Sequence, residues 1–442
     1  MSAERLPHDT VEDERRVLER IPGGTQLFSK RPEQFAPGQW PRFYSRARGS
    51  SVWTTDGREF TDMSTSGIGT CTLGFADVDV NSAVHEAVER GSMSSLNCRE
   101  DLELADLLVE LHPWADQVRY ARTGGEAMSI AVRLARATTG RSVVAFCGYH
   151  GWHDWYLAAN IANGRDLDRH LLPGLEPSGV PIELRSTAVP FEYNSLDSLR
   201  QIVAAHGNRL AAIVMEPVRS TEPAPGFLAG VREIADRTGA VLVFDEVTSG
   251  LRVASTGIHM TLGVMPDIAV LAKSIGNGFP MAAVIGTAAV MAAAEKSFVS
   301  STYWTELIGP TAAIATLEKH RRLDVGSHLV RIGARVQKGW AAAASGAGLD
   351  VDISGIAPLS RLSFRTPCSQ AVATLFTQSM LDHGYLAGTS FYPSLAHDDA
   401  TVDRYLAAVQ ETFGLLATAI SEESVKRRLR GPVAQSGFGR LA

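Results

Sequence analysis

The sequence predicts an α/β protein whose central part forms a mostly parallel sheet with helices packed against it. Five short apolar runs have the length and composition of buried strands: residues 142–146, 210–215, 240–244, 267–272 and 281–286. Amphipathic helical patterns at 195–206 and 228–239 lie between them, and Gly239 closes the second. Strands that alternate with helices are typical of parallel sheets with right-handed crossovers.

The two ends of the chain have a different pattern, and 442 residues are enough for more than one lobe. Residues 1–75 contain a predicted hairpin around Asp56 and Gly57, and residues 326–442 mix helical patterns with short strands. We therefore expect a large domain at 76–325 and a smaller α+β domain built from both ends of the chain. The active site is expected in the cleft between these domains.

The composition argues against several classes of partner. The net charge is −6 and the basic residues are scattered, so neither nucleic acid nor a membrane surface is an expected partner. No apolar run approaches about 18 residues, and the polar N-terminus does not resemble a secretory signal. The four cysteines have no metal-ligand spacing, which favours a reducing compartment, so we expect a cytoplasmic protein. The basic C-terminal tail, 427–442, is expected to be loosely held.

Polar residues follow three of the predicted strands. Asp245 comes directly after the third strand and Lys273 after the fourth, while Tyr149 and His150 lie just beyond the first. Because open α/β sheets bind ligands at the carboxyl ends of their strands, these residues form a candidate site. Each also has a plainer interpretation: Asp245 can pair with a structural arginine, Lys273 can be solvated, and Tyr149 can pack in the core.

A glycine-rich turn precedes another helical pattern. Thr123, Gly124 and Gly125 stand where an amphipathic helix begins, and the free amide groups of such a turn bind anions. The stretch therefore predicts a phosphate cup. An ordinary capped helix start, with Glu126 in its first turn, remains an equal alternative at this point.

An amine, an acid, an aromatic ring and a phosphate cup are together the requirements of pyridoxal 5′-phosphate. A nicotinamide-dependent oxidoreductase is disfavoured, because the glycine pattern at 67–72 lacks its third glycine and its strand-to-helix context. His150, His153 and Asp154 are interpreted as hydrogen-bonding residues rather than metal ligands, so no metal is expected.

Six stretches occur in an order that resembles one family. They are VRYARTGGEAMSIAVRLARATTGR, FCGYHGWHDW, MEPV, VFDEVTSGLR, VLAKSIGNGFP and TELIGP. In this order they resemble the motifs of the class III pyridoxal-phosphate aminotransferases, and IPGGTQLFSKRP with LAHDD is similar to the branch that contains glutamate-1-semialdehyde aminomutase. The resemblance covers about residues 20–415. It implies fold type I, with a mostly parallel seven-stranded sheet, and a homodimer with shared active sites to which the N-terminal segment contributes contacts.

The resemblance also implies a role for individual residues. Lys273 would form the Schiff base and act as general acid and base, and Asp245 would pair with the pyridine nitrogen. The remaining implied cofactor contacts are Val247 and Tyr149 on the two ring faces, Thr123, Gly124 and Gly125 on the phosphate, Glu216 as support, and Thr305 on the phosphate of the neighbouring subunit, with Thr302 as a rival for that role.

The expected reaction moves an amino group from an amine donor to an aldehyde or ketone acceptor, both of them small molecules. An intramolecular aminomutase is the alternative, and a cofactor-binding regulator without activity is a more remote one. Four places depart from the family pattern: the cup 123–125, which lacks one hydroxyl, Gly276-Asn277-Gly278, Thr389, and the segment 29–32.

The substrate itself is left open by the sequence. Ser29 and Lys30 are substrate candidates, and Arg31, Arg252 and Arg361 are further candidates for a carboxylate. Trp152 and Trp155 fit either the floor of a pocket or a packing role in the dimer.

Overall fold

The computed structural model describes residues 11–168, 170, 174–218 and 220–437. The chain divides into two compact units, one formed by residues 78–327 and the other by the two ends, up to residue 77 and from residue 328. None of the helices in the described ranges is long and apolar enough to cross a membrane. The first ten residues, on which the expectation about a secretory signal partly depends, lie outside the described residues.

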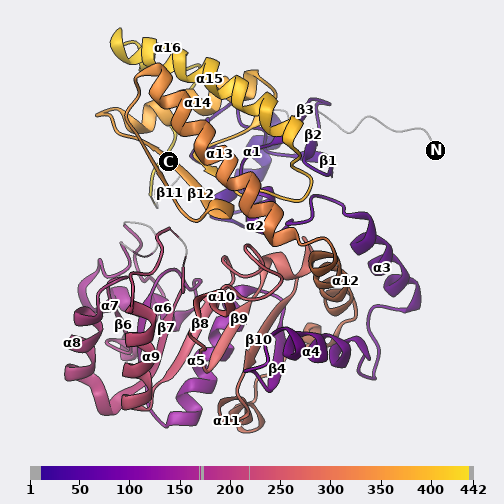
Figure 1. The fold of residues 1–442 in the computed structure, drawn as a ribbon, viewed down its shortest axis with the longest axis vertical. Coiled ribbons are helices and arrows are strands. Elements are labelled where there is room, and N and C mark those ends of the chain that lie inside the picture. Colours follow the sequence, from indigo (N-terminus) through magenta and orange to yellow (C-terminus); the bar gives the residue numbers. More distant parts are fainter. Residues whose placement is uncertain (1–10, 169, 171–173, 219, 438–442) are drawn as a thin grey trace. The chain divides into compact units, whose positions relative to one another are not determined.

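The unit of residues 78–327 contains a seven-stranded sheet in the order β4-β10-β9-β8-β7-β5-β6 (Figure 1). Its strands are β4 (Gln117–Ala121), β5 (Val143–Cys147), β6 (Ala188–Pro190), β7 (Leu210–Met215), β8 (Val241–Glu246), β9 (Ile268–Leu271) and β10 (Ala282–Gly286). β10 is antiparallel to both of its neighbours, and the pairs from β9 to β6 are all parallel. The prediction of a mostly parallel sheet is confirmed, and so are its five predicted strands.

The other two strands of this sheet, β4 and β6, have sequence patterns too weak to predict a strand. β4 has the sequence QVRYA and begins with exposed and half-buried residues, and β6 has only three residues and ends in a proline. Neither is a continuous apolar run, so periodicity alone could not distinguish them from loops.

Helices cover both faces of this sheet. Val144 and Phe146 of β5 pack with α5 (Gly124–Thr139), whereas Val143 and Ala145 pack with α8 (Leu196–His206) and α9 (Phe227–Thr238). The alternation follows from the pleat of a strand, which sends successive side chains to opposite faces. The hydroxyl of Ser195 caps α8, and Gly239, with φ of 66°, ends α9 as predicted.

The other helices of this unit are short or lie at its margin. They are α3 (Val78–Arg90), α4 (Glu100–Leu111), α6 (Asp154–Leu157), α7 (Ala159–Asn163), α10 (His259–Leu262), α11 (Ala288–Met291), α12 (Ile308–Arg322) and α13 (Val325–Ala347), which continues into the second unit, with 3₁₀ turns η3 (Ile182–Leu184), η4 (Gly207–Arg209), η5 (Lys273–Gly276), η6 (Ala292–Lys296) and η7 (Thr302–Thr305).

The second unit contains a four-stranded sheet in the order β1-β2-β3-β13 and a three-stranded sheet in the order β11-β12-β14. The predicted hairpin is present, because Gly57, with φ of 86°, turns β2 into β3. The elements are α1 (Val11–Arg20), η1 (Phe28–Lys30), η2 (Pro32–Gln34), β1 (Tyr44–Arg48), β2 (Ser51–Thr54), β3 (Glu59–Asp62), α2 (Ser66–Gly69), β11 (Val351–Ser354), η8 (Ala357–Leu359), β12 (Ser360–Phe364), α14 (Ser369–Asp382), β13 (Tyr385–Leu386), β14 (Ser390–Phe391), α15 (Asp399–Ser421) and α16 (Val425–Arg428).

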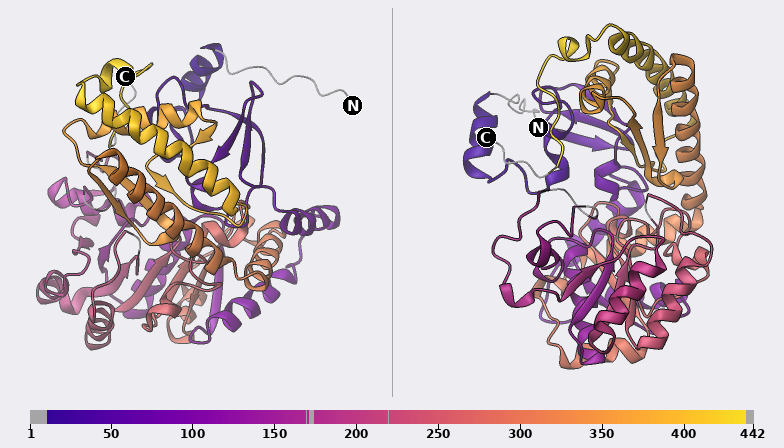
Figure 2. Two further views of the ribbon diagram at one scale, coloured as in Figure 1. Left: turned by 45° about the horizontal axis from the view of Figure 1, so that its top comes forward. Right: turned by 90° about the vertical axis from the view of Figure 1, so that its left-hand side faces the viewer.

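The core of the second unit lies between helices and the three-stranded sheet. α14 and α15 pack side by side (Figure 2), and Phe376 and Phe413 from these helices meet Phe364 of β12 with ring centroids 5.8–6.0 Å apart. The described part of the C-terminal tail is attached to this unit. The amide of Arg430 donates to Gln378 at 2.8 Å, and that of Ala434 donates to Thr374 at 3.0 Å.

Candidate active site

The strand order brings most of the predicted site residues to one edge of the large sheet. β9, β8, β7 and β5 are parallel neighbours, so their carboxyl ends lie along one edge. β4 is reached from β9 through two antiparallel pairings, so it runs in the same direction and also ends there. The residues delivered to this edge are Tyr149 and His150 after β5, Glu216 after β7, Asp245 in β8, Lys273 after β9, and Thr123, Gly124 and Gly125 after β4.

Asp245 is almost fully buried and has two hydrogen-bond partners. Its Oδ2 lies 2.8 Å from His150 Nδ1, and its Oδ1 accepts a hydrogen bond from the amide of Val247 at 3.0 Å. His150 is buried as well, and its Nε2 lies 3.2 Å from the carbonyl oxygen of Cys147. The partner of Asp245 is therefore a histidine and not the structural arginine that the sequence allowed. The sequence placed His150 at the strand end but carried no signal for this pairing.

Glu246, the next residue, serves the opposite face of the strand. It is completely buried and accepts hydrogen bonds from His259 Nδ1 and from the amide of His259, the latter at 2.9 Å. Trp114 Nε1 donates to His259 Nε2 at 2.8 Å. This network anchors the chain that follows β8, while Asp245 alone faces the side of His150.

Lys273 has an unusual backbone conformation. Its φ is 49°, in the left-handed region that non-glycine residues seldom adopt, and it begins the turn η5. Its Nζ donates a hydrogen bond to Thr248 Oγ1 at 2.8 Å. Such strain persists only where the surroundings impose it, and it is concentrated at functional sites. The side chain is half-buried and its amine is bound to Thr248, so Lys273 is not the freely solvated lysine that the sequence allowed.

The glycine-rich turn begins α5, and Thr123 is its N-cap residue. Thr123 Oγ1 accepts from the amide of Glu126 at 3.3 Å and donates to Glu126 Oε2 at 3.0 Å, so the two form a capping box. The capped helix start is thus present. The amides of Gly124 and Gly125 lie in the first turn, where a helix offers them no partner. A Cβ on Gly124 would lie 2.9 Å from Val247 Cγ1, so only glycine leaves this approach open.

Glu216 supports the loop that follows β5. Its Oε2 accepts from the amide of Tyr149 at 3.0 Å, and a Cβ on Gly148 would lie 2.7 Å from the same oxygen. The Tyr149 ring packs edge to face on Tyr156, with centroids 6.2 Å apart. Burial, together with the nearby Glu216, raises the pKa of the Cys147 thiol to about 12, so this cysteine stays protonated at neutral pH.

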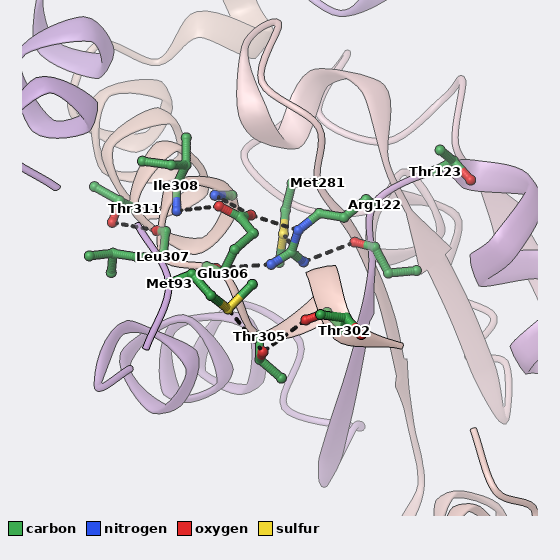
Figure 3. A network of polar contacts seen from close by, with 12 residues as sticks. Met93, Arg122, Thr123, Met281, Thr302, Thr305, Glu306, Leu307, Ile308 and Thr311 are labelled. Atoms are coloured by element: carbon green, nitrogen blue, oxygen red, sulfur yellow. Dashed lines mark hydrogen bonds and ion pairs between the residues drawn. The ribbon is translucent and has the colours of Figure 1, made fainter. Parts of the chain in front are cut away.

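Thr305 is exposed on η7, and Figure 3 shows how its segment is anchored. Its Oγ1 donates to the carbonyl of Thr302 at 2.9 Å and contacts Met93 Sδ at 3.7 Å. The next residue, Glu306, accepts from Arg122 Nε at 2.7 Å in a largely buried ion pair. Since Arg122 precedes Thr123, this pair ties the Thr305 segment to the start of the cup.

The substrate candidates are carried by other elements than these strand ends. Ser29 and Lys30 are exposed on η1 of the second unit, and Arg361 is exposed on β12 of that unit. Arg252 is 1% exposed and its Nε donates to the carbonyl of Thr248 at 3.0 Å, so it belongs to the scaffold beneath Lys273. Among the described residues, no three histidine, cysteine, aspartate or glutamate side chains are grouped to hold a metal ion.

The comparisons with known proteins identify this arrangement. The profile of the family "Aminotransferase class-III" matches residues 35–358. The chain belongs to the class III aminotransferases. These enzymes use pyridoxal 5′-phosphate and act on small-molecule amines and carbonyl compounds.

Two relatives illustrate the range of this family. This class III aminotransferase is 34% identical over 428 residues to the glutamate-1-semialdehyde 2,1-aminomutase of Bordetella avium, covering 91% of this chain and 97% of that protein. It is 32% identical over 357 residues to the 3-aminobutyryl-CoA aminotransferase of Cloacimonas acidaminovorans, covering 78% of this chain and 81% of that protein. Both an aminotransferase and an aminomutase are therefore among its relatives.

Solved structures share the fold. The FumI protein of Sphingopyxis sp. MTA144, described in its pyridoxal-phosphate form, has a TM-score of 0.84 and 25% identity, covering 93% of this chain and 97% of that chain. An omega-transaminase of Sphaerobacter thermophilus has a TM-score of 0.81 and 24% identity, covering 93% of this chain and 98% of that chain. The expected fold type I and the expected cofactor are confirmed.

The donor chemistry of the sheet edge fits this cofactor. A buried carboxylate suits a protonated ring nitrogen, a directed lysine amine suits an aldehyde, and the amides of Gly124 and Gly125 at a helix start suit a phosphate. The close approach of Gly124 to Val247 leaves no room for a side chain at residue 124, as expected where a backbone must come close to its neighbours.

Proposed function

We propose that this class III aminotransferase transfers an amino group from a small amine donor to an aldehyde or ketone, with Lys273 as its reactive amine. The observation that carries the proposal is the convergence of Lys273, the buried Asp245 and the glycine amides of α5 at one edge of the sheet. We assign Asp245 to the pyridine nitrogen, Gly124 and Gly125 with the N-cap Thr123 to the phosphate, and Glu216 to the support of this set.

The ring of the cofactor would lie between Val247 and Tyr149. Val247 follows Asp245, and its side chain approaches Gly124, so it lines the space between the acid and the cup. Two contacts fix the position of Tyr149: its amide donates to Glu216, and its ring packs edge to face on Tyr156. When bound, pyridoxal 5′-phosphate supplies an aldehyde that condenses with amines and a ring that takes up electrons from the substrate carbon.

The chain's own groups carry the proton transfers. Lys273 Nζ would take a proton from the amine-bearing carbon of the donor, and in the second half of the reaction it would deliver a proton to the carbonyl carbon of the acceptor. Thr248 Oγ1, which accepts a hydrogen bond from Nζ at 2.8 Å, orients the amine. Asp245 would favour the protonated form of the ring nitrogen, and His150 holds the Asp245 carboxylate in place.

We further propose a cytoplasmic homodimer in which Thr305 of each subunit reaches the phosphate site of the other. The segments around Thr305 expose large apolar side chains, which suits a surface that a second copy covers: Met93, Leu96, Phe298 and Tyr303. No disulfide joins the four cysteines, which agrees with a reducing compartment. Ser29 and Lys30 remain our candidates for contacts with the substrate.

The second candidate function is an aminomutase that moves an amino group between neighbouring carbons of one substrate. The similarity to the Bordetella avium aminomutase over 91% of this chain favours it. The two reactions differ in their products, because a transaminase releases a keto compound from the donor and an aminomutase releases none.

The decisive experiment is a single turnover without an acceptor. Purified enzyme loaded with pyridoxal 5′-phosphate is mixed separately with glutamate, alanine and other amine donors, and the keto acid released per active site is measured. One equivalent from one of these donors supports the transaminase. If none of the donors yields keto acid, while glutamate-1-semialdehyde is isomerised, the aminomutase is the correct assignment and our first proposal fails.

A further inference from the structure

We infer that His153 supplies a side-chain hydrogen bond to the phosphate group of the cofactor, in the space left by the missing side chain of Gly125. The inference rests on the proposed function, in which the turn 123–125 holds that phosphate. It adds a ligand from a different segment, the loop between β5 and α6.

The turn at the start of α5 has few hydrogen-bond donors for a phosphate group besides its backbone amides. The hydroxyl proton of Thr123 is directed to Glu126 Oε2 at 3.0 Å within the capping box, so it is already engaged. Gly124 and Gly125 contribute no side chain. A phosphate carries up to two negative charges and three acceptor oxygens, and two glycine amides leave part of this capacity without donors.

The ring of His153 lies where a side chain at residue 125 would begin. A Cβ built on Gly125 would be 2.8 Å from His153 Cε1 and 2.9 Å from His153 Nδ1, closer than real side chains approach. The loop backbone is equally near, since a Cβ on Gly151 would lie 3.3 Å from the Cα of Gly125. Glycine at residue 125 and histidine at residue 153 are therefore complementary in shape.

The nitrogen on this edge of the ring has no hydrogen-bond partner in the part of the chain that the structure describes. Nδ1 of His153 is buried, and it makes no hydrogen bond with any of the described residues. Buried polar atoms are nearly always satisfied, so an orphan of this kind calls for a ligand. The ring is held for such a contact by stacking on Trp152, with centroids 4.5 Å apart and an interplanar angle of 17°.

The charge of His153 can adapt to an anion. Burial lowers the pKa of its imidazole, against the opposing effect of the Glu126 and Asp154 carboxylates. A bound phosphate favours the protonated form, so the same nitrogen becomes a charged donor when the anion is present. The feature that carries the inference remains the position of Nδ1 against Gly125.

The test compares the affinity of the apoenzyme for pyridoxal 5′-phosphate, for pyridoxal, which lacks the phosphate, and for inorganic phosphate. His153→Leu should weaken the binding of pyridoxal 5′-phosphate and inorganic phosphate about tenfold to a hundredfold, and leave pyridoxal unchanged. His153→Asn, whose amide can donate from a similar position, should lose much less. Thermal unfolding of each apoenzyme identifies variants that do not fold.

A complementary pair of variants provides the rescue. Gly125→Ser alone should weaken phosphate binding, because its side chain collides with the His153 ring. Gly125→Ser combined with His153→Ala should restore the preference for the phosphorylated form, because the serine hydroxyl then occupies the vacated space. A structural role for His153 would instead change the affinities for pyridoxal and pyridoxal 5′-phosphate by the same factor.

Two failures are distinguishable. If the wild-type apoenzyme does not prefer pyridoxal 5′-phosphate over pyridoxal, the phosphate cup itself is wrong and the proposed function loses its basis. If the wild type has this preference and folded His153→Leu keeps it in full, the cup stands and the inference about His153 is overturned.

Discussion

The Nδ1 atom of His150 lies 2.8 Å from Oδ2 of Asp245, while Nε2 of the same ring lies 3.2 Å from the carbonyl oxygen of Cys147. A carboxylate oxygen can only accept, so Nδ1 of His150 is the donor in this hydrogen bond. The bond holds the Asp245 carboxylate in one orientation, and the contact with the Cys147 carbonyl holds the His150 ring.

The first prediction concerns this pair. His150→Leu should lower the unfolding free energy of the apoenzyme by about 1–3 kcal/mol, because a buried carboxylate loses its donor. It should also weaken cofactor binding, because Asp245 is no longer held. His150→Asn retains a donor and should lose less in both denaturant titration and cofactor affinity. Equal behaviour of the two variants would contradict the role of this hydrogen bond.

The second prediction concerns the reactive amine. Lys273→Ala should lower turnover about 10²–10⁴-fold, as expected for the loss of a positioned proton-transfer group. Thr248→Val removes only the hydroxyl that accepts from Nζ, so it should lower the rate constant by a smaller factor while the cofactor still attaches to Lys273. Steady-state rates, with whichever donor the single-turnover experiment identifies, provide the measurement. Near-normal turnover of Lys273→Ala would exclude the proposed mechanism.

The third prediction concerns the anchor of the Thr305 segment. Arg122→Met should destabilise the protein by about 3–5 kcal/mol, because it leaves Glu306 largely buried without its cation. Arg122→Met with Glu306→Gln should recover part of this loss, which denaturant titration of all four proteins measures as a coupling energy. Sedimentation of the same variants tests whether the segment contributes to the dimer. Strict additivity in stability would show that the ion pair does not anchor the segment.

The fourth prediction concerns acid stability. His112 Nδ1 lies 2.9 Å from the carbonyl of Leu108, and Nε2 accepts from the amide of Gly257 at 2.9 Å, so the buried ring is neutral. Burial lowers the pKa of His112 to about 4. The unfolded chain, with a histidine pKa near 6.5, then binds more protons than the folded protein between pH 6.5 and 4, and stability falls as the pH falls through this window.

The size of this effect follows from the shift, which corresponds to about 3 kcal/mol for His112. His112→Asn should be less stable than the wild type at pH 7, since it cannot make both hydrogen bonds. Its unfolding free energy should decline less between pH 6.5 and 4, so the two curves converge toward acid pH. Parallel curves in urea titrations across this range would refute the assignment.

Much of the fold could be predicted from local pattern. The five apolar runs correspond to β5, β7, β8, β9 and β10. Helix α8 begins after its N-cap Ser195, and helix α9 ends at its C-cap Gly239. These features depend on burial and on backbone conformation over a few residues, and the side chains of those same residues determine both. The strands β4 and β6 were missed because their pairing partners, and not their own composition, make them strands.

The candidate site was predicted in its members but not in its contacts. Asp245, Lys273 and the cup follow from their positions after strands, since a parallel sheet collects such positions at one edge. Three contacts emerge only in three dimensions. They are the hydrogen bond between Asp245 and His150, the hydrogen bond from the Thr123 hydroxyl to Glu126, and the approach of His153 to Gly125. The roles of these residues toward the cofactor remain predictions.

The sequence by itself determined the mostly parallel sheet, the family and the cofactor, because strand periodicity and ordered motifs are local and additive signals. Only the tertiary structure decided which side chains form hydrogen bonds with one another, and which buried atom has no partner among the described residues. Those outcomes depend on differences of a few tenths of an ångström in the distances between residues far apart in the chain, such as the 2.8 Å between His150 Nδ1 and Asp245 Oδ2. The packing of whole helices and strands against one another sets these distances. No short stretch of sequence contains that information.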